Sequence, residues 1–232
     1  MGEYKCKECR DTGWILSKDE TGHEYARPCK CRMLEEARKR FERSGLATQF
    51  RNKNFDNYIT SGNRILEDAK SQAEKYAREF EPEGHENLSI LFSGQVGAGK
   101  THLGTAISQE LINREVPVLY MPYRDALTSL KQNILNEEEY ARQIHKFMTA
   151  EVLFMDDLLK GKLTEADINI LYEIVNYRYN NSLPMIVSTE KTVEQLLEFD
   201  EAIGSRILEM SRGYVISFKG ALLNYRLYGK AV

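Results

Sequence analysis

Short apolar runs alternate with amphipathic stretches from about residue 88 to residue 218. The apolar runs are bounded by turn-forming or polar positions, which predicts strands at 88–93, 117–121, 152–155, 185–188 and 214–218. Between them, apolar residues recur at intervals of three and four, which predicts helices at 100–114, 123–133, 137–149, 164–180, 193–199 and 201–210. This alternation is typical of an α/β fold in which helices cover both faces of a parallel, here five-stranded, sheet.

The chain before residue 88 follows a different pattern. Residues 1–32 are polar, with Gly13 and Gly22 marking turns. A charged helix is predicted at 32–43, ending at Ser44 and Gly45. Segment 48–58 is irregular, and a further helix at 64–80 is closed by Pro82 and Gly84. We therefore divide the chain into an N-terminal unit with its linker helix, residues 1–45, and a larger domain, residues 48–232.

The sequence GQVGAGKT at 94–101 lies between the first predicted strand and the helix that follows it. It matches a phosphate-binding P-loop. Gly94, Gly97 and Gly99 allow a tight turn whose backbone N–H groups face phosphate oxygens, Lys100 reaches the β- and γ-phosphates, and Thr101 is a ligand for Mg²⁺. A glycine-rich loop that binds no nucleotide is the alternative. The strand before it and the helix after it favour an ATP- or GTP-binding protein.

The strand predicted at 152–155 ends in two carboxylates, Asp156 and Asp157. We interpret them as a Walker B motif, in which Asp156 holds Mg²⁺ indirectly, through the ion's own ligands, and Asp157 polarises the attacking water. An aspartate pair that merely opens a surface loop is the alternative. Two carboxylates at this position favour a hydrolase over a small-molecule kinase.

These motifs, together with residues 204–207 (GSRI) and 224–226 (NYR), resemble the AAA+ ATPases of the DnaC/DnaI type, with IstB-like proteins as relatives. The resemblance covers about residues 48–232. It implies an AAA+ P-loop fold without a C-terminal lid domain, an arginine finger at Arg206 that acts on a neighbouring subunit, and a sensor 2 arginine at Arg226. The sensor 1 position usually ends in asparagine in this family, but here Thr189 is followed by Glu190. A glutamate there would repel the γ-phosphate unless neutralised, so we assign the nucleotide contact to Thr189.

All four cysteines lie in the first 31 residues, as Cys6-x₂-Cys9 and Cys29-x-Cys31. Four thiolates in two close pairs suit tetrahedral Zn²⁺. Free structural thiols or a redox pair are the alternatives, and His23 is a substitute ligand. DnaI-type loaders resemble this layout, whereas IstB-type proteins generally lack it. We expect Trp14 and Tyr25, between the two pairs, to form a miniature core.

The formal net charge of −3 provides no overall attraction to nucleic acid, so any DNA contact must be local. Arg124, Lys131, Lys160 and Lys162 are candidates, each with a solvated surface charge as the alternative. Neither a membrane span nor a signal peptide is evident, so we expect a cytoplasmic protein.

The resemblance implies an ATP-dependent helicase loader in DNA replication. Such a protein binds the replicative DNA helicase and single-stranded DNA, forms an ATP-dependent homo-oligomer, and has weak, partner-stimulated ATPase activity. Its cofactors are ATP and Mg²⁺, with Zn²⁺ in the N-terminal unit. Two alternatives stay open: an IstB-type transposition helper, and a nucleotide-dependent scaffold with little hydrolysis.

Overall fold

The computed structural model describes residues 4–19, 21–43, 45–81 and 89–228. Ser44, Pro82, Gly84 and Leu88, which bound predicted elements, lie outside these ranges. Among the described helices, none is both long and apolar enough to cross a bilayer.

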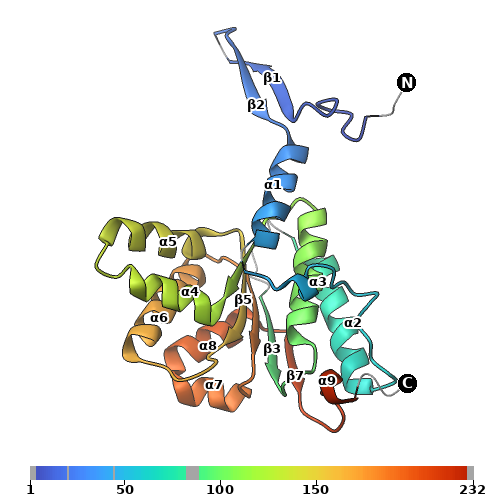
Figure 1. Cartoon of the computed structure of the whole chain (residues 1–232), viewed down its shortest axis with the longest axis vertical. Helices are drawn as coiled ribbons and strands as arrows, with labels where there is room; N and C mark the ends of the chain where they lie inside the picture. Colours follow the sequence, from blue (N-terminus) through green and yellow to red (C-terminus); the bar gives the residue numbers. More distant parts are fainter. Residues whose placement is uncertain (1–3, 20, 44, 82–88, 229–232) are drawn as a thin grey trace.

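A five-stranded sheet forms the centre of the larger domain (Figure 1). Its strands are β3 (Ile90–Gly94), β4 (Val118–Pro122), β5 (Val152–Leu158), β6 (Met185–Thr189) and β7 (Val215–Phe218). The order across the sheet is β4-β5-β6-β3-β7, and every neighbouring pair is parallel. The predicted α/β fold with a parallel five-stranded sheet is therefore confirmed. The Gly-rich loop follows β3 and the aspartate pair lies near the end of β5, so both lie at the carboxyl ends of the strands, with only β6 between them.

Helices cover both faces of this sheet. One face carries α1 (Lys30–Arg43), α2 (Arg64–Glu79) and α3 (Lys100–Asn113), with a short 3₁₀ turn at Thr48–Phe50. The other carries α4 (Tyr123–Gln132), α5 (Glu137–Thr149), α6 (Glu165–Asn180), α7 (Val193–Phe199) and α8 (Glu201–Met210). A short helix, α9 (Tyr225–Tyr228), ends the described chain and was not predicted.

Successive strand residues pack into two separate cores. Phe92 and Phe154 join the core under α2 and α3, whereas Leu91 and Met155 join the core under α4 to α8. Side chains alternate between the faces of a strand, so a run that is apolar throughout must be covered on both sides. Full burial of each such side chain contributes about 1.5–3 kcal/mol.

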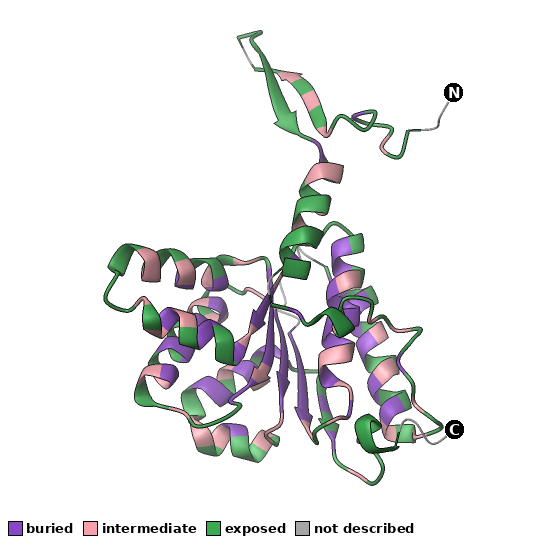
Figure 2. Cartoon of the chain, in the orientation of Figure 1, coloured by how far each residue is buried: buried purple, intermediate pink, exposed green. Residues whose placement is uncertain are grey.

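The N-terminal unit is a hairpin of β1 (Trp14–Lys18) and β2 (Glu24–Pro28), which α1 joins to the larger domain (Figure 1). Its residues are mostly exposed, as Figure 2 shows. Trp14 is 46% and Tyr25 50% exposed, so the prediction that they form a miniature core is wrong. Instead, the guanidinium of Arg32 lies 4.2 Å from the centre of the Trp14 ring. A hairpin with so little buried apolar surface needs another source of stability.

Arg178, on α6, is fully buried and ties α5 to the start of β6. Its guanidinium donates hydrogen bonds to the carbonyl oxygens of Phe147, Ala150 and Pro184 at 2.7–3.0 Å. We expect Arg178→Met to lower the free energy of unfolding by about 3–5 kcal/mol, because it leaves several buried carbonyls without a donor. Urea unfolding measures this. Arg212→Met is the matched control, since Arg212 is exposed; equal losses in the two variants would contradict the assignment.

Candidate nucleotide-binding site

The Gly-rich loop between β3 and α3 can be built only with glycine at three positions. Gly94, Gly97 and Gly99 have φ angles of 108°, 77° and 84°, which L side chains rarely adopt. Space is also lacking: a Cβ on Gly94 would lie 2.4 Å from the carbonyl oxygen of Phe218, and one on Gly99 would lie 2.5 Å from the Tyr58 ring. The loop therefore turns tightly and leads into the N-terminus of α3, where unpaired N–H groups favour an anion.

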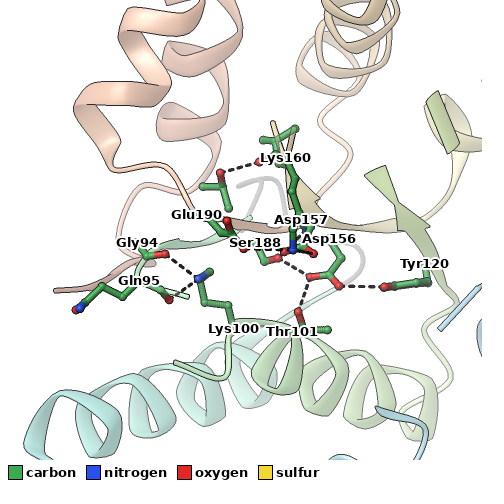
Figure 3. Close-up of polar contacts among 12 residues, drawn as sticks. Gly94, Gln95, Lys100, Thr101, Tyr120, Asp156, Asp157, Lys160, Ser188 and Glu190 are labelled. Atoms are coloured by element: carbon green, nitrogen blue, oxygen red, sulfur yellow. Dashed lines mark hydrogen bonds and ion pairs between the residues drawn. The ribbon is translucent and has the colours of Figure 1, made fainter. Parts of the chain in front are cut away.

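Lys100 begins α3, and its side chain folds back on the loop. Its Nζ donates hydrogen bonds to the carbonyl oxygens of Gly94 and Gln95, both at 2.7 Å (Figure 3). Burial lowers the pKa of Lys100, while the carboxylates of Glu190 and Asp157 oppose this shift. The ammonium thus lies inside the loop, where phosphate oxygens could replace the two carbonyls as its acceptors.

Asp156, near the end of β5, accepts hydrogen bonds from three hydroxyl groups. Thr101 and Tyr120 each donate at 2.9 Å, and Ser188 donates a further bond to the oxygen that Thr101 contacts (Figure 3). Burial raises the pKa of Asp156, while the hydrogen bond from Ser188 acts in the opposite direction. Thr101 and Asp156 therefore present a hydroxyl and a carboxylate oxygen together, the donor types that Mg²⁺ takes in proteins.

Asp157 points away from this buried network because β5 is irregular at its end. The pairing of β5 with β6 shifts between Met155 and Leu158, and Asp157 has a φ of 58°. Its N–H donates to Ser188 Oγ at 3.0 Å, which replaces a lost sheet bond. The carboxylate forms an ion pair of 2.8 Å with Lys160, which also lies 3.2 Å from Glu190. The two aspartates thus separate into one buried and one partly exposed carboxylate.

A cavity of about 750 Å³ extends over this edge of the sheet. That volume suits a small-molecule ligand. It brings together most of the residues predicted for nucleotide binding and hydrolysis: Gly97, Gly99, Lys100, Thr101, Asp156, Asp157 and Arg226. Gly94, Thr189 and Arg206 do not line it.

Thr189 uses its hydroxyl within the sheet. The group is buried, donates to the carbonyl oxygen of Leu158 at 2.8 Å, and accepts from the N–H of Lys191 at 3.1 Å. The structure therefore does not bring this hydroxyl into the cavity. Glu190, the next residue, lines the cavity instead.

The two predicted arginines occupy different surroundings. Arg226 lies on α9, whose first N–H, from Tyr225, donates to the carbonyl oxygen of Gly97 at 3.0 Å. Arg206 lies on α8 between Tyr172 and Tyr179, with its guanidinium 5.4 Å from each ring centre. The α8 position leaves Arg206 outside the cavity of its own chain.

Sequence reasoning missed several residues that shape the site. Tyr120 and Ser188 anchor Asp156, and the Tyr58 hydroxyl donates to the carbonyl oxygen of Ala98 at 2.8 Å. His102 contacts the carbonyl oxygen of Asn54 at 2.8 Å, which ties segment 48–58 to α3. None belongs to the glycine, lysine and aspartate positions of the two motifs, although His102 directly follows Thr101. The only signal was the polar or aromatic residue near the carboxyl end of a buried strand, at Tyr120 and Ser188.

Two of the four candidate DNA contacts, Lys131 and Lys160, form ion pairs within the chain. Lys131 forms an ion pair of 2.7 Å with Asp167, and Arg124 and Lys160 line the nucleotide cavity. Lys162 is exposed, as expected for a surface charge.

The four cysteines come together at the base of the hairpin. Their Sγ atoms all lie within 4.8 Å of one another, with 3.8 Å between Cys6 and Cys29 and 3.4 Å between Cys9 and Cys31. A disulfide requires about 2.05 Å. Zn–S bonds of about 2.3 Å in a tetrahedron place the sulfurs about 3.8 Å apart, so the cluster fits Zn²⁺. His23 is exposed and bonds Thr21, at 2.8 Å, so it is not part of the cluster.

Comparison with known proteins agrees with this geometry. The family model of the IstB-like ATP binding protein matches residues 53–219. Phage-like element PBSX protein XkdC of Bacillus subtilis is 35% identical over 97% of this chain and 87% of its own length. Replicative helicase loader DnaC of Escherichia coli is 28% identical over 74% of this chain and 68% of its own length.

Solved structures show the same fold. The crystal structure of the DnaC helicase loader superposes with a TM-score of 0.61 at 23% identity, over 75% of this chain and 100% of that one. The structure of DnaI gives a TM-score of 0.60 at 22% identity, over 75% of this chain and 95% of that one. The fold is that of an AAA+ P-loop ATPase, and the chain belongs to the IstB-like family of ATP-binding proteins.

Proposed function

We propose that this protein is an ATP-dependent helicase loader of DNA replication, which binds a replicative helicase and assists its placement on single-stranded DNA. The relative named replicative helicase loader DnaC supports this function, as do DnaC and DnaI among the structural neighbours. XkdC aligns with nearly all of this chain, whereas the IstB-like match begins at residue 53. The N-terminal unit therefore lies outside the residues that the IstB-like family model matches.

One contact carries the proposal, because it joins the N-terminal unit to the nucleotide site. Phe41 of α1 packs edge-on against Tyr120, with ring centres 6.1 Å apart, and the Tyr120 hydroxyl bonds Asp156. Nucleotide occupancy can therefore bias the position of α1 through two packed side chains. A helix that carries a partner-binding unit and contacts the ATP site suits a protein that binds a partner and then releases it.

The residues of the site have distinct roles in ATP hydrolysis. The amides after Gly97 and Gly99, with Lys100, bind the β-phosphate, and Arg226 contacts the nucleotide from α9. Thr101 and Asp156 would hold Mg²⁺, which neutralises charge on the phosphates. Asp157 accepts a proton from the attacking water. Arg206 acts on the nucleotide of a neighbouring copy in an ATP-dependent homo-oligomer. To reach it, the guanidinium moves away from Tyr172 and Tyr179 of its own chain.

The hairpin and α1, residues 1–45, form the partner-binding unit, and residues 48–232 form the ATPase domain. Cys6, Cys9, Cys29 and Cys31 would hold one Zn²⁺, whose chemistry is structural: it cross-links a hairpin that lacks a core. Free thiols and a structural zinc both suit a cytoplasmic protein.

A scaffold with little hydrolysis is a second candidate, favoured by the pairing of Asp157 with Lys160 at 2.8 Å. A carboxylate occupied in this way is not available to water. Turnover that stays near zero with helicase and DNA both present would favour the scaffold.

We expect Leu16→Ser, in the full-length chain, to weaken helicase capture at least tenfold without changing nucleotide affinity. Leu16 is 76% exposed on the hairpin, so the change removes apolar contact surface without disturbing a core. Leu135→Ser is the matched control, because Leu135 is 96% exposed but lies between α4 and α5. Pull-down against the host's replicative helicase, with and without ATP, measures capture.

In the same experiment, Lys100→Ala is expected to retain helicase capture but to lose ATP-dependent binding of single-stranded DNA, measured by fluorescence anisotropy. DNA affinity of the parent should also fall with added salt, since the contact is with phosphates. Loss of capture in Leu135→Ser but not in Leu16→Ser would place the helicase contact on the ATPase domain and contradict the division.

A further inference from the structure

Three carboxylates lie at the part of the nucleotide cavity where β5 and β6 end. Asp156, Asp157 and Glu190 all line it, and Glu190 stands where the resemblance led us to expect an uncharged residue. Lys100 lies at the loop, bonded to Gly94 and Gln95, and does not form an ion pair with these carboxylates. The bound triphosphate would bring further negative charge to the same place, and like charges at close range repel.

Lys160 forms ion pairs with two of these carboxylates. Its Nζ lies 2.8 Å from Asp157 Oδ2 and 3.2 Å from Glu190 Oε1, so one ammonium bridges both (Figure 3). The hydrogen bond from Lys160 to Asp157 and its contact with Glu190 both raise the pKa of Lys160, which keeps it charged.

The backbone around Lys160 is held in place, and its side chain is partly exposed. Asp157, Leu159 and Gly161 have φ angles of 58°, 62° and 92°, and the Lys160 N–H donates to the carbonyl oxygen of Asp157 at 3.2 Å. Leu159 is buried in the core beneath α4 to α8 and anchors this turn. The Lys160 side chain is 45% exposed. A fixed turn thus presents a long, rotatable ammonium at the mouth of the cavity.

We propose that Lys160 supplies the positive charge for the γ-phosphate of ATP, and that Glu190 is the positioning residue that keeps Lys160 at the cavity before ATP arrives. When the ammonium moves from Asp157 to the phosphate, the Asp157 carboxylate becomes free to accept a proton from water. This inference rests on the proposed ATP-binding function and names the residue that distinguishes ATP from ADP.

The test compares affinity for a non-hydrolysable ATP analogue with affinity for ADP, both with Mg²⁺, by calorimetry on the full-length chain. Lys160→Ala is expected to weaken binding of the analogue about tenfold and to leave the Kd of ADP within about twofold, because only the analogue carries a γ-phosphate. Lys162→Ala is the matched control, since it removes an exposed charge two residues away, and it should match the parent. Equal weakening of both nucleotides, or no change in either, would overturn the inference.

A double variant separates direct contact from simple neutralisation. In Lys160→Ala, the Glu190 carboxylate is left unpaired and repels the γ-phosphate, so Lys160→Ala with Glu190→Gln is expected to regain only part of the lost affinity. Full recovery would mean that Lys160 only neutralises Glu190, which contradicts the contact. If the parent binds neither nucleotide, both the proposed function and this inference are wrong. If the parent binds both, and Lys160→Ala leaves the ratio of the two affinities unchanged, only this inference is wrong.

Discussion

Replacing Asp157 with asparagine is expected to lower ATP turnover about 10²- to 10⁴-fold while leaving nucleotide affinity within about twofold. The side chain loses its basic oxygen, but the Gly-rich loop, Lys100 and the buried Asp156 network are unchanged. Asparagine also tolerates the left-handed backbone at this position, where φ is 58°. Its amide oxygen can still accept a hydrogen bond from Lys160. The measurement pairs steady-state ATP hydrolysis, with helicase and single-stranded DNA present, with the Kd of a non-hydrolysable ATP analogue.

Lys100→Ala is the contrasting variant in this experiment. It removes the cation that faces the phosphates, so affinity should fall along with turnover. Asp157→Ala is a poorer probe, because alanine is strained at a positive φ and the turn that carries Lys160 would be disturbed as well. Turnover by Asp157→Asn equal to that of the parent would exclude Asp157 as the base.

The strands and the Gly-rich loop could be predicted because their signals are local. Five apolar runs were assigned as strands and all five are present, with bounds that differ by a few residues. The loop was evident because its glycines and Lys100 lie together in one short stretch, residues 94–101. Such features depend on neighbouring residues, which sequence reasoning can examine directly.

The surroundings of Asp156 could not be predicted, because they depend on which strands pair. Tyr120 and Ser188 come from β4 and β6, the two strands that flank β5, and lie 36 and 32 residues away along the chain. No periodicity in the sequence fixes that order. The shift in pairing at the end of β5 is equally hidden, although it separates the directions of Asp156 and Asp157.

The ion-pair partner of Glu190 could not be predicted from the sequence for the same reason. The sequence showed an acidic residue beside the expected γ-phosphate, and it required a neutralising partner, but Lys160 was considered only as a surface or DNA-contacting charge. The partner became visible once the turn after β5 was found to face the residue after β6. Thr189, the neighbouring residue in sequence, points into the sheet instead. Adjacent residues at a strand end face opposite ways, so a shift of one residue changes the assignment.

The N-terminal hairpin was not predicted as strands because apolar and polar residues do not alternate along its sequence. All β2 residues are exposed, β1 alternates only between exposed and half-buried residues, and the expected core of Trp14 and Tyr25 does not form. The cysteine spacing, in contrast, correctly predicted that four distant thiols meet. The cysteine spacing, rather than the hydrophobic pattern, is therefore the sequence feature that indicates this part of the fold.

Loss of the cysteine cluster is expected to unfold the hairpin while the ATPase domain keeps its structure. We expect one zinc ion per chain in protein purified without chelator, and close to none in Cys29→Ser. Cys29 also bonds the hairpin to α1: its N–H donates to the carbonyl oxygen of Gly13 at 2.9 Å, and its own carbonyl accepts from the N–H groups of Arg32 and Met33. The start of α1 should therefore fray together with the hairpin.

The chain offers a local probe for this outcome, because Trp14 is its single tryptophan. Its fluorescence reports on the hairpin, where Arg32 lies over the ring, while nucleotide affinity reports on the distant cavity. Cys29→Ser, or the parent treated with a chelator, should shift the emission toward that of a solvated tryptophan and leave the Kd for ATP within about twofold. His23→Ala should retain zinc and the parent's emission, since His23 lies outside the cluster. A metal content near zero in freshly reduced, folded parent, with its emission unaffected by chelator, would show that the four thiols hold the hairpin without a metal.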